Sequence, residues 1–236
     1  MSQKQIVLPE IGLVRLHKRK GIRSVRITMA HDGTLRVSMP VWSPYKVGEA
    51  FVLSKRDWIL KHQTGKSKHV FLPNERIGKG HRLRFIHENR ANTTSRVTKN
   101  ELIVRLSLEN ETTDDNVQIV VNAGAIRALK QEAKILLPQR LQTLADSHGF
   151  SYRSVSIKRL KSRWGSCSTQ QDIALNCFLM QLPWDLIDYV LLHELLHTRV
   201  MAHGKKFWSE LANYVSDLPS KRRAIKTYQP TLVAQD

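Results

Sequence analysis

The 236-residue chain contains only two cysteines, Cys167 and Cys177, and neither belongs to a CxxC pair. This excludes a zinc ribbon built from cysteine pairs and is typical of a reducing compartment without structural disulfides. Long hydrophobic runs are also missing, because no segment approaches the roughly 18 apolar residues that a membrane-spanning helix needs. The N-terminal segment lacks the apolar core of a signal peptide. We therefore expect a cytoplasmic protein with no membrane partner.

Acidic residues are scarce: 20 Asp and Glu stand against 38 Lys and Arg, which gives a formal net charge of +18. The excess is concentrated in residues 1–100, which hold 21 basic and 6 acidic residues, whereas residues 101–236 hold 17 and 14. A basic surface attracts nucleic acid, nucleotide phosphates and other polyanions, although an ordinary solvated face has the same composition. The basic N-terminal part is therefore a candidate binding site for nucleic acid or another polyanion.

The N-terminal part shows the short period-two alternation of a β-sheet. Residues 13–39 contain three such segments, and a turn at residues 31–34 carries an Asp-Gly signal. Together they predict an antiparallel β-meander. Ser43 and Pro44 are typical of a helix start, and the apolar residues that follow predict one amphipathic helix to about His62.

Period-two alternation returns at residues 81–88 and 95–107, which predicts two more strands of the same N-terminal sheet. The acidic stretch at residues 109–115 coincides with the drop in basic charge. We therefore place a domain boundary there. Residues 1–110 would form a basic β-rich N-terminal domain, and residues 111–236 a second domain.

The second domain begins with a long helical pattern. It covers residues 117–148, Gly149 ends it, and Pro138 within it predicts a kink or a division into two helices. Residues 152–160 and 172–176 then alternate as strands that can pair with each other. The sequence thus predicts a small sheet after the long helix.

One stretch of the second domain indicates a particular chemistry, the sequence HELLH at residues 193–197. His193 and His197 lie four residues apart on one face of a helix, where both can bind a single Zn²⁺ ion. Glu194 projects about 100° around the helix from His193, so it can act as general base toward a water on the metal. A catalytic zinc site needs a third protein ligand and an open fourth position, and the next imidazole is that of His203.

His203 lies six residues after His197 and is therefore off the helical face. It can bind the same ion only if the helix ends between Thr198 and Ala202 and the chain turns back. About one or two per cent of chains with this length and composition would contain the HExxH pattern by chance. The apolar surroundings argue against chance, because burying two histidines and a glutamate without a metal costs several kcal/mol.

Four segments of the C-terminal half carry a family resemblance: SRWGSCS at residues 162–168, LN at 175–176, LPWDLIDYVLLHELLH at 182–197 and HGKKFW at 203–208. With them the chain resembles the YgjP-like metal-dependent hydrolases, a zincin family related to SprT-like and WLM-type metallopeptidases. The likeness extends more weakly over the basic N-terminal part. It therefore covers most of the chain.

The resemblance implies an α+β fold. A basic β-rich N-terminal part would precede a zincin-like part whose HExxH active-site helix packs on a small antiparallel sheet. The resemblance also implies that His193, His197 and His203 are the metal ligands and that Glu194 is the catalytic acid, the same four residues that the spacing indicates. Zn²⁺ is the expected ion, and Ni²⁺, Mn²⁺ or Co²⁺ can also occupy a site of nitrogen donors.

These features predict a zinc-dependent, metallopeptidase-like hydrolase in which Glu194 activates a metal-bound water for attack on a peptide carbonyl. Some members of the family are assigned a nucleotide pyrophosphatase activity. A nucleoside triphosphate (UTP-type) pyrophosphatase that uses the same metal site is therefore one alternative. A nucleic-acid-associated SprT-like protease is a second alternative. The expected substrate is accordingly a peptide or a nucleotide.

The segment RWGSC at residues 163–167 has two interpretations. The guanidinium of Arg163 can stabilise negative charge that develops on a carbonyl or phosphoryl group, which makes Arg163 a candidate catalytic residue. Alternatively, the segment is a tight turn with Trp164 in the core. Asn176 and Tyr189 are candidates for supporting the metal ligands, with core packing as the other explanation.

Overall fold

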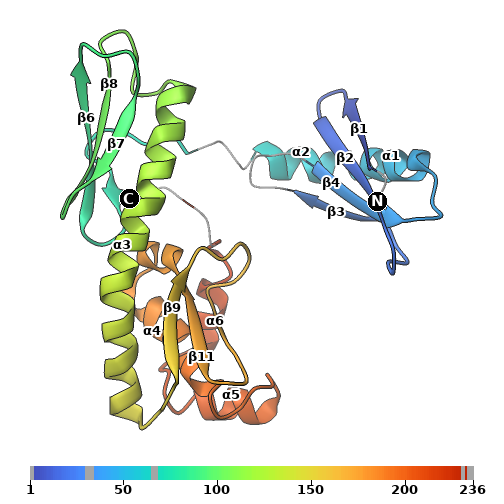
Figure 1. Ribbon diagram of the computed structural model, residues 1–236. Helices are drawn as coiled ribbons and strands as arrows, with labels where there is room; N and C mark the ends of the chain where they lie inside the picture. Colours follow the sequence, from blue (N-terminus) through green and yellow to red (C-terminus); the bar gives the residue numbers. More distant parts are fainter. Residues whose placement is uncertain (1–2, 30–34, 65–68, 230–231, 233–236) are drawn as a thin grey trace. The chain divides into compact units, whose positions relative to one another are not determined.

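The computed structural model describes residues 3–29, 35–64, 69–229 and 232. The chain combines helices and strands and divides into two compact units, Met1–His69 and Val70–Asp236, each with its own hydrophobic core. Figure 1 shows the elements of both units. Among the described residues, no helix is both long enough and apolar enough to cross a membrane.

The first unit contains a four-stranded sheet with the order β1-β2-β4-β3. β2 and β4 run parallel, whereas the two outer pairs are antiparallel. The predicted antiparallel meander is therefore wrong here. Residues 20–25 connect β2 to β3, which do not pair with each other, because β4 lies between them and β3 forms the edge of the sheet. The predicted turn at residues 31–34 lies outside the described residues. The strands are β1 (Gln3–Leu8), β2 (Gly12–Arg19), β3 (Arg26–Met29) and β4 (Leu35–Pro40).

Two helices, α1 (Tyr45–Ser54) and α2 (Arg56–Thr64), pack on one face of this sheet. The single helix predicted for this stretch is interrupted at Lys55. Alternate residues of β2 and β4 are fully buried beneath the helices. Gly48 of α1 lies so close to the sheet that an added Cβ would come 3.2 Å from both Leu16 Cδ2 and Met39 Sδ. The residues between the buried ones point to the opposite face, which is polar.

The second unit begins with another four-stranded sheet, of order β5-β6-β8-β7. Its pairing repeats that of the first sheet, with two antiparallel outer pairs and a parallel central pair, β6 and β8. Its strands are β5 (Arg76–Ile77), β6 (His81–Glu88), β7 (Thr94–Val97) and β8 (Glu101–Ser107). These strands thus form a sheet of their own and do not extend the N-terminal sheet, contrary to the prediction.

The second sheet packs on the long helix α3 (Asp115–His148). Leu102 of β8 lies against Gly124 of α3, where an added Cβ would come 2.6 Å from Leu102 Cδ1. The compact units therefore divide between residues 69 and 70, not near the predicted boundary after residue 110. Alternation in a strand shows that one face is buried but does not say which element buries it.

Helix α3 runs as one element of 34 residues through the second unit (Figure 1). Gly149 caps its C-terminus in the left-handed conformation, as predicted, with a φ of 66°. Pro138 lies within the helix without dividing it. The helix contacts β7 and β8 along one part and β9, η1 and α4 along another, so it connects the second sheet to the elements around the histidines.

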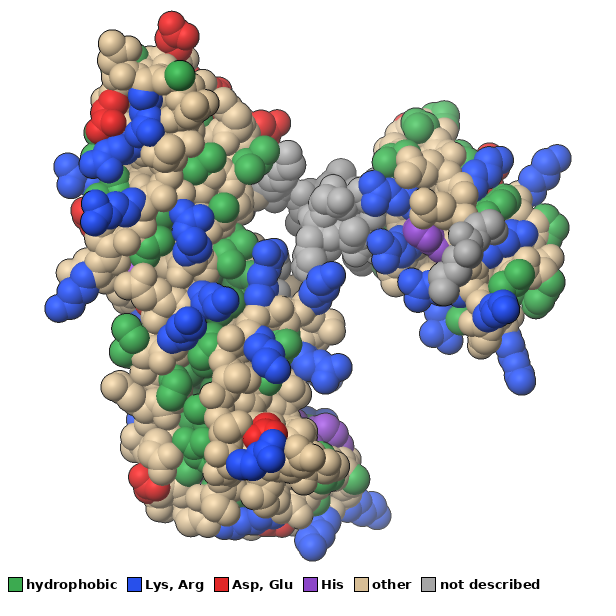
Figure 2. Space-filling view, in the orientation of Figure 1, with side chains coloured by type: hydrophobic (Ala, Val, Ile, Leu, Met, Phe, Trp, Pro, Cys, Tyr) green, Lys and Arg blue, Asp and Glu red, His purple; other side chains and the backbone are tan. Residues whose placement is uncertain are grey.

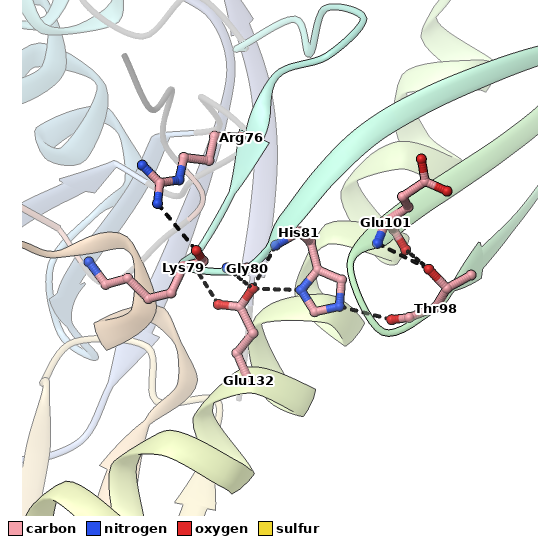
Figure 3. A network of polar contacts seen from close by, with 7 residues as sticks. All are labelled: Arg76, Lys79, Gly80, His81, Thr98, Glu101 and Glu132. Carbon is pink, nitrogen blue, oxygen red and sulfur yellow. Dashed lines mark hydrogen bonds and ion pairs between the residues drawn. The ribbon is translucent and has the colours of Figure 1, made fainter.

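A buried carboxylate on α3 holds the turn between β5 and β6, as Figure 3 shows. Glu132 accepts hydrogen bonds from the backbone N–H groups of Lys79, Gly80 and His81, at 2.6, 2.8 and 3.1 Å. The ring of His81 contacts the same carboxylate at 2.5 Å through Nδ1 and the carbonyl of Thr98 at 3.0 Å through Nε2. Lys79 Nζ in turn donates to the carbonyl of Leu182, just before α4. The network joins the second sheet, α3 and the start of α4.

After α3 comes a three-stranded sheet of order β10-β11-β9. Its strands are β9 (Ser154–Lys158), β10 (Gly165–Cys167) and β11 (Asp172–Asn176). β10 and β11 are antiparallel, but β11 and β9 are parallel. The predicted antiparallel sheet is therefore wrong for one of its two strand pairs. β11 lies between β10 and β9, and its pair with β9 is parallel. The unit ends with η1 (Cys177–Gln181), α4 (Trp184–Leu196), α5 (Lys205–Leu211) and α6 (Leu218–Ala224).

Candidate metal centre

Helix α4 carries the HELLH sequence and is almost entirely buried. Pro183 precedes its first turn, and Asp185 lies in that turn, where the helix dipole favours a carboxylate. Arg140 of α3 forms a bidentate pair with Asp188, with Nε to Oδ1 at 2.7 Å and Nη2 to Oδ2 at 2.5 Å. These contacts fix the helix in position before the chain reaches the histidines.

The three predicted histidine ligands converge on one point. The Nε2 atoms of His193 and His197 are 3.2 Å apart, those of His197 and His203 are 3.1 Å apart, and those of His193 and His203 are 2.9 Å apart. The convergence is possible because α4 ends at Leu196, with His197 as its C-cap, and a tight turn brings His203 back. The helix thus ends before residue 203, as the prediction requires, but at Leu196, two residues before the predicted stretch from Thr198 to Ala202.

The geometry of the three nitrogens fits a tetrahedral ion. Two nitrogens at about 2.0–2.1 Å from a tetrahedral zinc lie about 3.3 Å apart, close to the observed spacing, and a three-histidine set leaves the fourth position open. Three ring nitrogens this close cannot all satisfy one another by hydrogen bonding. The residues therefore fit a single divalent metal ion.

Nearby contacts position His197 and His203. His197 Nδ1 lies 3.1 Å from the carbonyl of Val200, so this nitrogen carries the proton and Nε2 presents its lone pair. The indole N–H of Trp208 donates to the carbonyl of His203 at 3.1 Å. The ring of Phe207 stacks on His197 with centroids 4.6 Å apart. α5, which supplies both aromatic residues, therefore closes one side of the cluster.

Burial favours the neutral form of His193 and His197. Burial, followed by the effects of His197, His203 and Arg222, lowers the pKa of His193 to about 3. Burial is also the main cause that lowers the pKa of His197. A neutral imidazole has a free lone pair, so both residues are in the form that binds metal.

Glu194 is 4% exposed, and its Oε2 atom has no hydrogen-bond partner among the residues that the structure describes. Burial raises the pKa of the Glu194 carboxyl to about 8, and the positive charge of Arg163 opposes this shift. A cation bound to the three imidazoles would also favour the carboxylate form, because it is the largest local charge.

A comparison with known protein families shows where the chain belongs. The sequence profile of the YgjP-like, metallopeptidase domain family matches residues 23–228. The chain belongs to this family. As a YgjP-like protein with a metallopeptidase domain, it is a metal-dependent hydrolase.

Two solved structures are similar to parts of this YgjP-like chain, both titled as metallopeptidase zymogens. Abylysin from Pyrococcus abyssi is 24% identical, with 42% of this chain and 100% of that chain covered and a TM-score of 0.36. Jannalysin from Methanocaldococcus jannaschii is 27% identical, with 39% and 92% covered and a TM-score of 0.33. No curated protein matches the chain.

The strand β10 of the YgjP-like protein explains part of the RWGSC segment. Gly165 lies against Glu194, so closely that an added Cβ would come 2.7 Å from Glu194 Cγ and Oε1 and 2.8 Å from Cδ. Any larger residue would push the acid out of its position. Sequence reasoning missed this role, because Gly165 has no unusual φ and stands nearly thirty residues before the glutamate.

Asn176 is fully buried and supports the loop before β10. Its Nδ2 donates to the carbonyls of Leu160 and Arg163, at 2.8 and 2.9 Å. It therefore fixes this loop, and its side-chain hydrogen bonds within the described residues go to the backbone. The Arg163 side chain is exposed, and its charge acts on Glu194. Trp164 packs against the core, in line with the structural interpretation of the segment.

Cys167 lies on β10, and burial, followed by the charges of Glu194 and Asp172, raises the pKa of its thiol to about 11. The thiol is therefore protonated at neutral pH, and a protonated thiol is a poor nucleophile. Tyr189 is buried one turn before His193, with ring centroids 6.2 Å apart. Its placement combines core packing with a contact to a candidate ligand.

Proposed function

We propose that this YgjP-like protein is a zinc metallopeptidase in which Glu194 is the general base for attack of water on a peptide carbonyl. One observation carries the proposal: Glu194, which directly follows His193 on α4, has a buried carboxylate oxygen with no partner among the described residues, and His193 is one of three imidazoles whose nitrogens converge. A buried acceptor without a partner costs about 1–3 kcal/mol. Its presence beside a metal-binding cluster is better explained by chemistry than by stability.

Each residue of the centre has a distinct task in this proposal. His193, His197 and His203 would hold the ion, which supplies Lewis acidity that polarises a carbonyl and makes water more acidic. Glu194 takes the proton from the attacking water and passes it to the nitrogen of the leaving amine. The same histidine set also suits Ni²⁺, Mn²⁺ or Co²⁺.

Arg163 is proposed to stabilise charge during the reaction. Its guanidinium is free to approach a substrate, because the side chain is exposed. In this role it stabilises the negative charge that develops on the carbonyl oxygen. The support for the assignment is that its charge already acts on Glu194, the proposed base.

One observation favours a second candidate function, hydrolysis of a nucleoside triphosphate of the UTP type. Arg222 of α6 stacks on Trp208 with its Cζ 3.8 Å from the ring centroid, and its charge also lowers the pKa of His193. With Arg163 it supplies two permanent positive charges near the cluster. Guanidinium groups suit phosphates, so this arrangement would also serve an anionic substrate.

The test is the metal-loaded protein assayed with casein and with a panel of nucleoside triphosphates, beside Glu194→Gln. Glutamine keeps the shape but cannot accept the proton, so turnover should fall by about 10²- to 10⁴-fold while metal content stays unchanged. Loss of metal in the variant would make Glu194 a ligand or a structural support. Full activity on the better substrate would assign the base to another group.

A further inference from the structure

The polar face of the N-terminal sheet, opposite α1 and α2, is built from two cross-strand rows. Arg15, Arg36 and Thr28 are neighbours in one row, and His17, Ser38 and Arg26 are neighbours in the next. We call these six side chains the outer face. Their neighbours along β2 and β4 are fully buried on the other side of the sheet, namely Val14, Leu16, Leu35, Val37 and Met39.

The outer face concentrates positive charge in a way that sheet stability does not explain. Arg15 and Arg36 are directly paired in the register of two adjacent strands, about 4.8 Å apart, and like charges in this relation destabilise a sheet. The strands β1 to β4 contain no Asp or Glu. Within the described residues, no carboxylate forms an ion pair with Arg15, Arg26 or Arg36. Figure 2 shows Lys and Arg side chains around the visible side of this unit with few acidic ones among them.

Two polar atoms on this face lack partners. Arg15 Nε and His17 Nε2 are buried and make no hydrogen bond to any residue that the structure describes. Burial, followed by the charges of Arg36, Arg19 and Arg15, lowers the pKa of His17. The arginines thus create a potential that disfavours one more positive charge. An anionic ligand on this face would relieve this repulsion.

The chemistry of the outer face indicates which anion fits. Guanidinium, imidazole and hydroxyl groups are the donors that proteins use to contact nucleic acid phosphates. A membrane-binding face would instead bury a broad apolar area. Single strands gain about 1–3 kcal/mol per base by stacking on aromatic rings, and β1 to β4 contain no Phe, Tyr or Trp. A duplex carries the higher backbone charge density, one charge per about 1.7 Å.

We propose that the outer face binds the phosphate backbone of duplex nucleic acid without regard to base sequence. Arg15 and Arg36 form its centre, and Arg26 extends it toward the edge strand β3. The binding would hold the hydrolase on nucleic acid through a unit separate from the metal centre. It does not depend on which substrate that centre takes.

The test uses the full-length protein and a fluorescent 30-base-pair DNA duplex, with binding followed by anisotropy across a range of salt concentrations. Arg15→Gln/Arg36→Gln removes two charges from the outer face. Lys46→Gln/Lys55→Gln removes two exposed charges from α1 and its C-cap and serves as the matched control. Each phosphate contact contributes about 0.9 to the slope of log K against log salt, so the arginine variant should lose about 1.8 of that slope and roughly 10- to 100-fold in affinity near 100 mM salt.

The control variant should keep the wild-type slope to within about half of one contact. The control variant should melt at the wild-type temperature, and the arginine variant at that temperature or slightly above it, because removing the two paired charges relieves their repulsion. Equal losses in the two variants would show a diffuse charge effect and overturn the assignment of the outer face. Absence of salt-dependent binding by the wild-type protein would overturn it as well, and so would tighter binding to single-stranded DNA or to phosphatidylserine vesicles.

Discussion

Gly165→Ala is the substitution for which the structure gives the sharpest expectation. The added Cβ would lie 2.7 Å from Glu194 Cγ and Oε1, whereas ordinary contacts begin at 3.4 Å, so the acid must move by about 0.7 Å. Glu194 is 4% exposed and has little room to retreat. Overpacking of this kind costs about 1–3 kcal/mol of stability. A misplacement of about 1 Å in a catalytic group costs up to about 10²-fold in rate. We therefore expect a 10- to 100-fold loss of kcat with the three histidines and their metal unchanged.

The assay for Gly165→Ala is turnover of the better substrate at saturation, with metal content measured on the same preparation. Gly204→Ala is the matched control, since Gly204 also lies beside a candidate ligand but has open space around its Cα and a φ of −77°. It should keep wild-type turnover to within a few fold. Wild-type kcat in Gly165→Ala would refute the role of this contact. Loss of metal would show that the contact supports the ligands and not the base.

Two further predictions concern the metal and the network on α3. Protein purified without added metal should contain about one divalent ion per chain, as a single three-ligand site requires, and His193→Ala/His197→Ala should lose it; undiminished metal content would contradict the site. A metal present at 100 times its Kd stabilises the folded state by about 2.7 kcal/mol, so chelation should lower the melting temperature measurably. Glu132→Ala leaves three backbone donors and the buried His81 ring without their acceptor, and should lower the free energy of unfolding by about 3–5 kcal/mol in urea denaturation; a loss under 1 kcal/mol would show that water replaces the carboxylate.

The part of the candidate site that the sequence predicted is the part encoded by short-range spacing. Helical periodicity places His193 and His197 on one face, and the requirement for a third ligand points to His203. The structure brings their three Nε2 atoms within 3.2 Å of one another. Residues whose roles depend on contacts between distant segments could not be found in this way. Gly165 and Glu132 are the two clearest cases, since each role follows from a close approach to an element far along the chain.

The fold, too, was predicted where local patterns encode it and missed where distant segments meet. Period-two alternation located most strands, and Gly149 marked the end of α3. Pairing direction and sheet membership were wrong, because the two four-stranded sheets have the same pairing order and equally short alternating strands. Nothing in the alternation separates them. What does separate them is the surface each one packs on, a pair of short helices in the first unit and α3 in the second.

The surface on which each sheet packs determines which residues belong to the unit that contains the metal centre. Residues 70–110 were expected to form part of the basic N-terminal domain, but Leu102, Val104 and Leu106 are fully buried in the core that also contains Val121 and the α4 residues beside the histidines. Lys79 reaches the carbonyl before α4, and Glu132 holds the turn that carries Lys79. A chain begun at residue 111 would therefore expose one side of α3 and lose a support of the metal helix. The basic excess within residues 70–100 thus belongs to the hydrolase unit, and the proposed nucleic acid surface is confined to the first 69 residues.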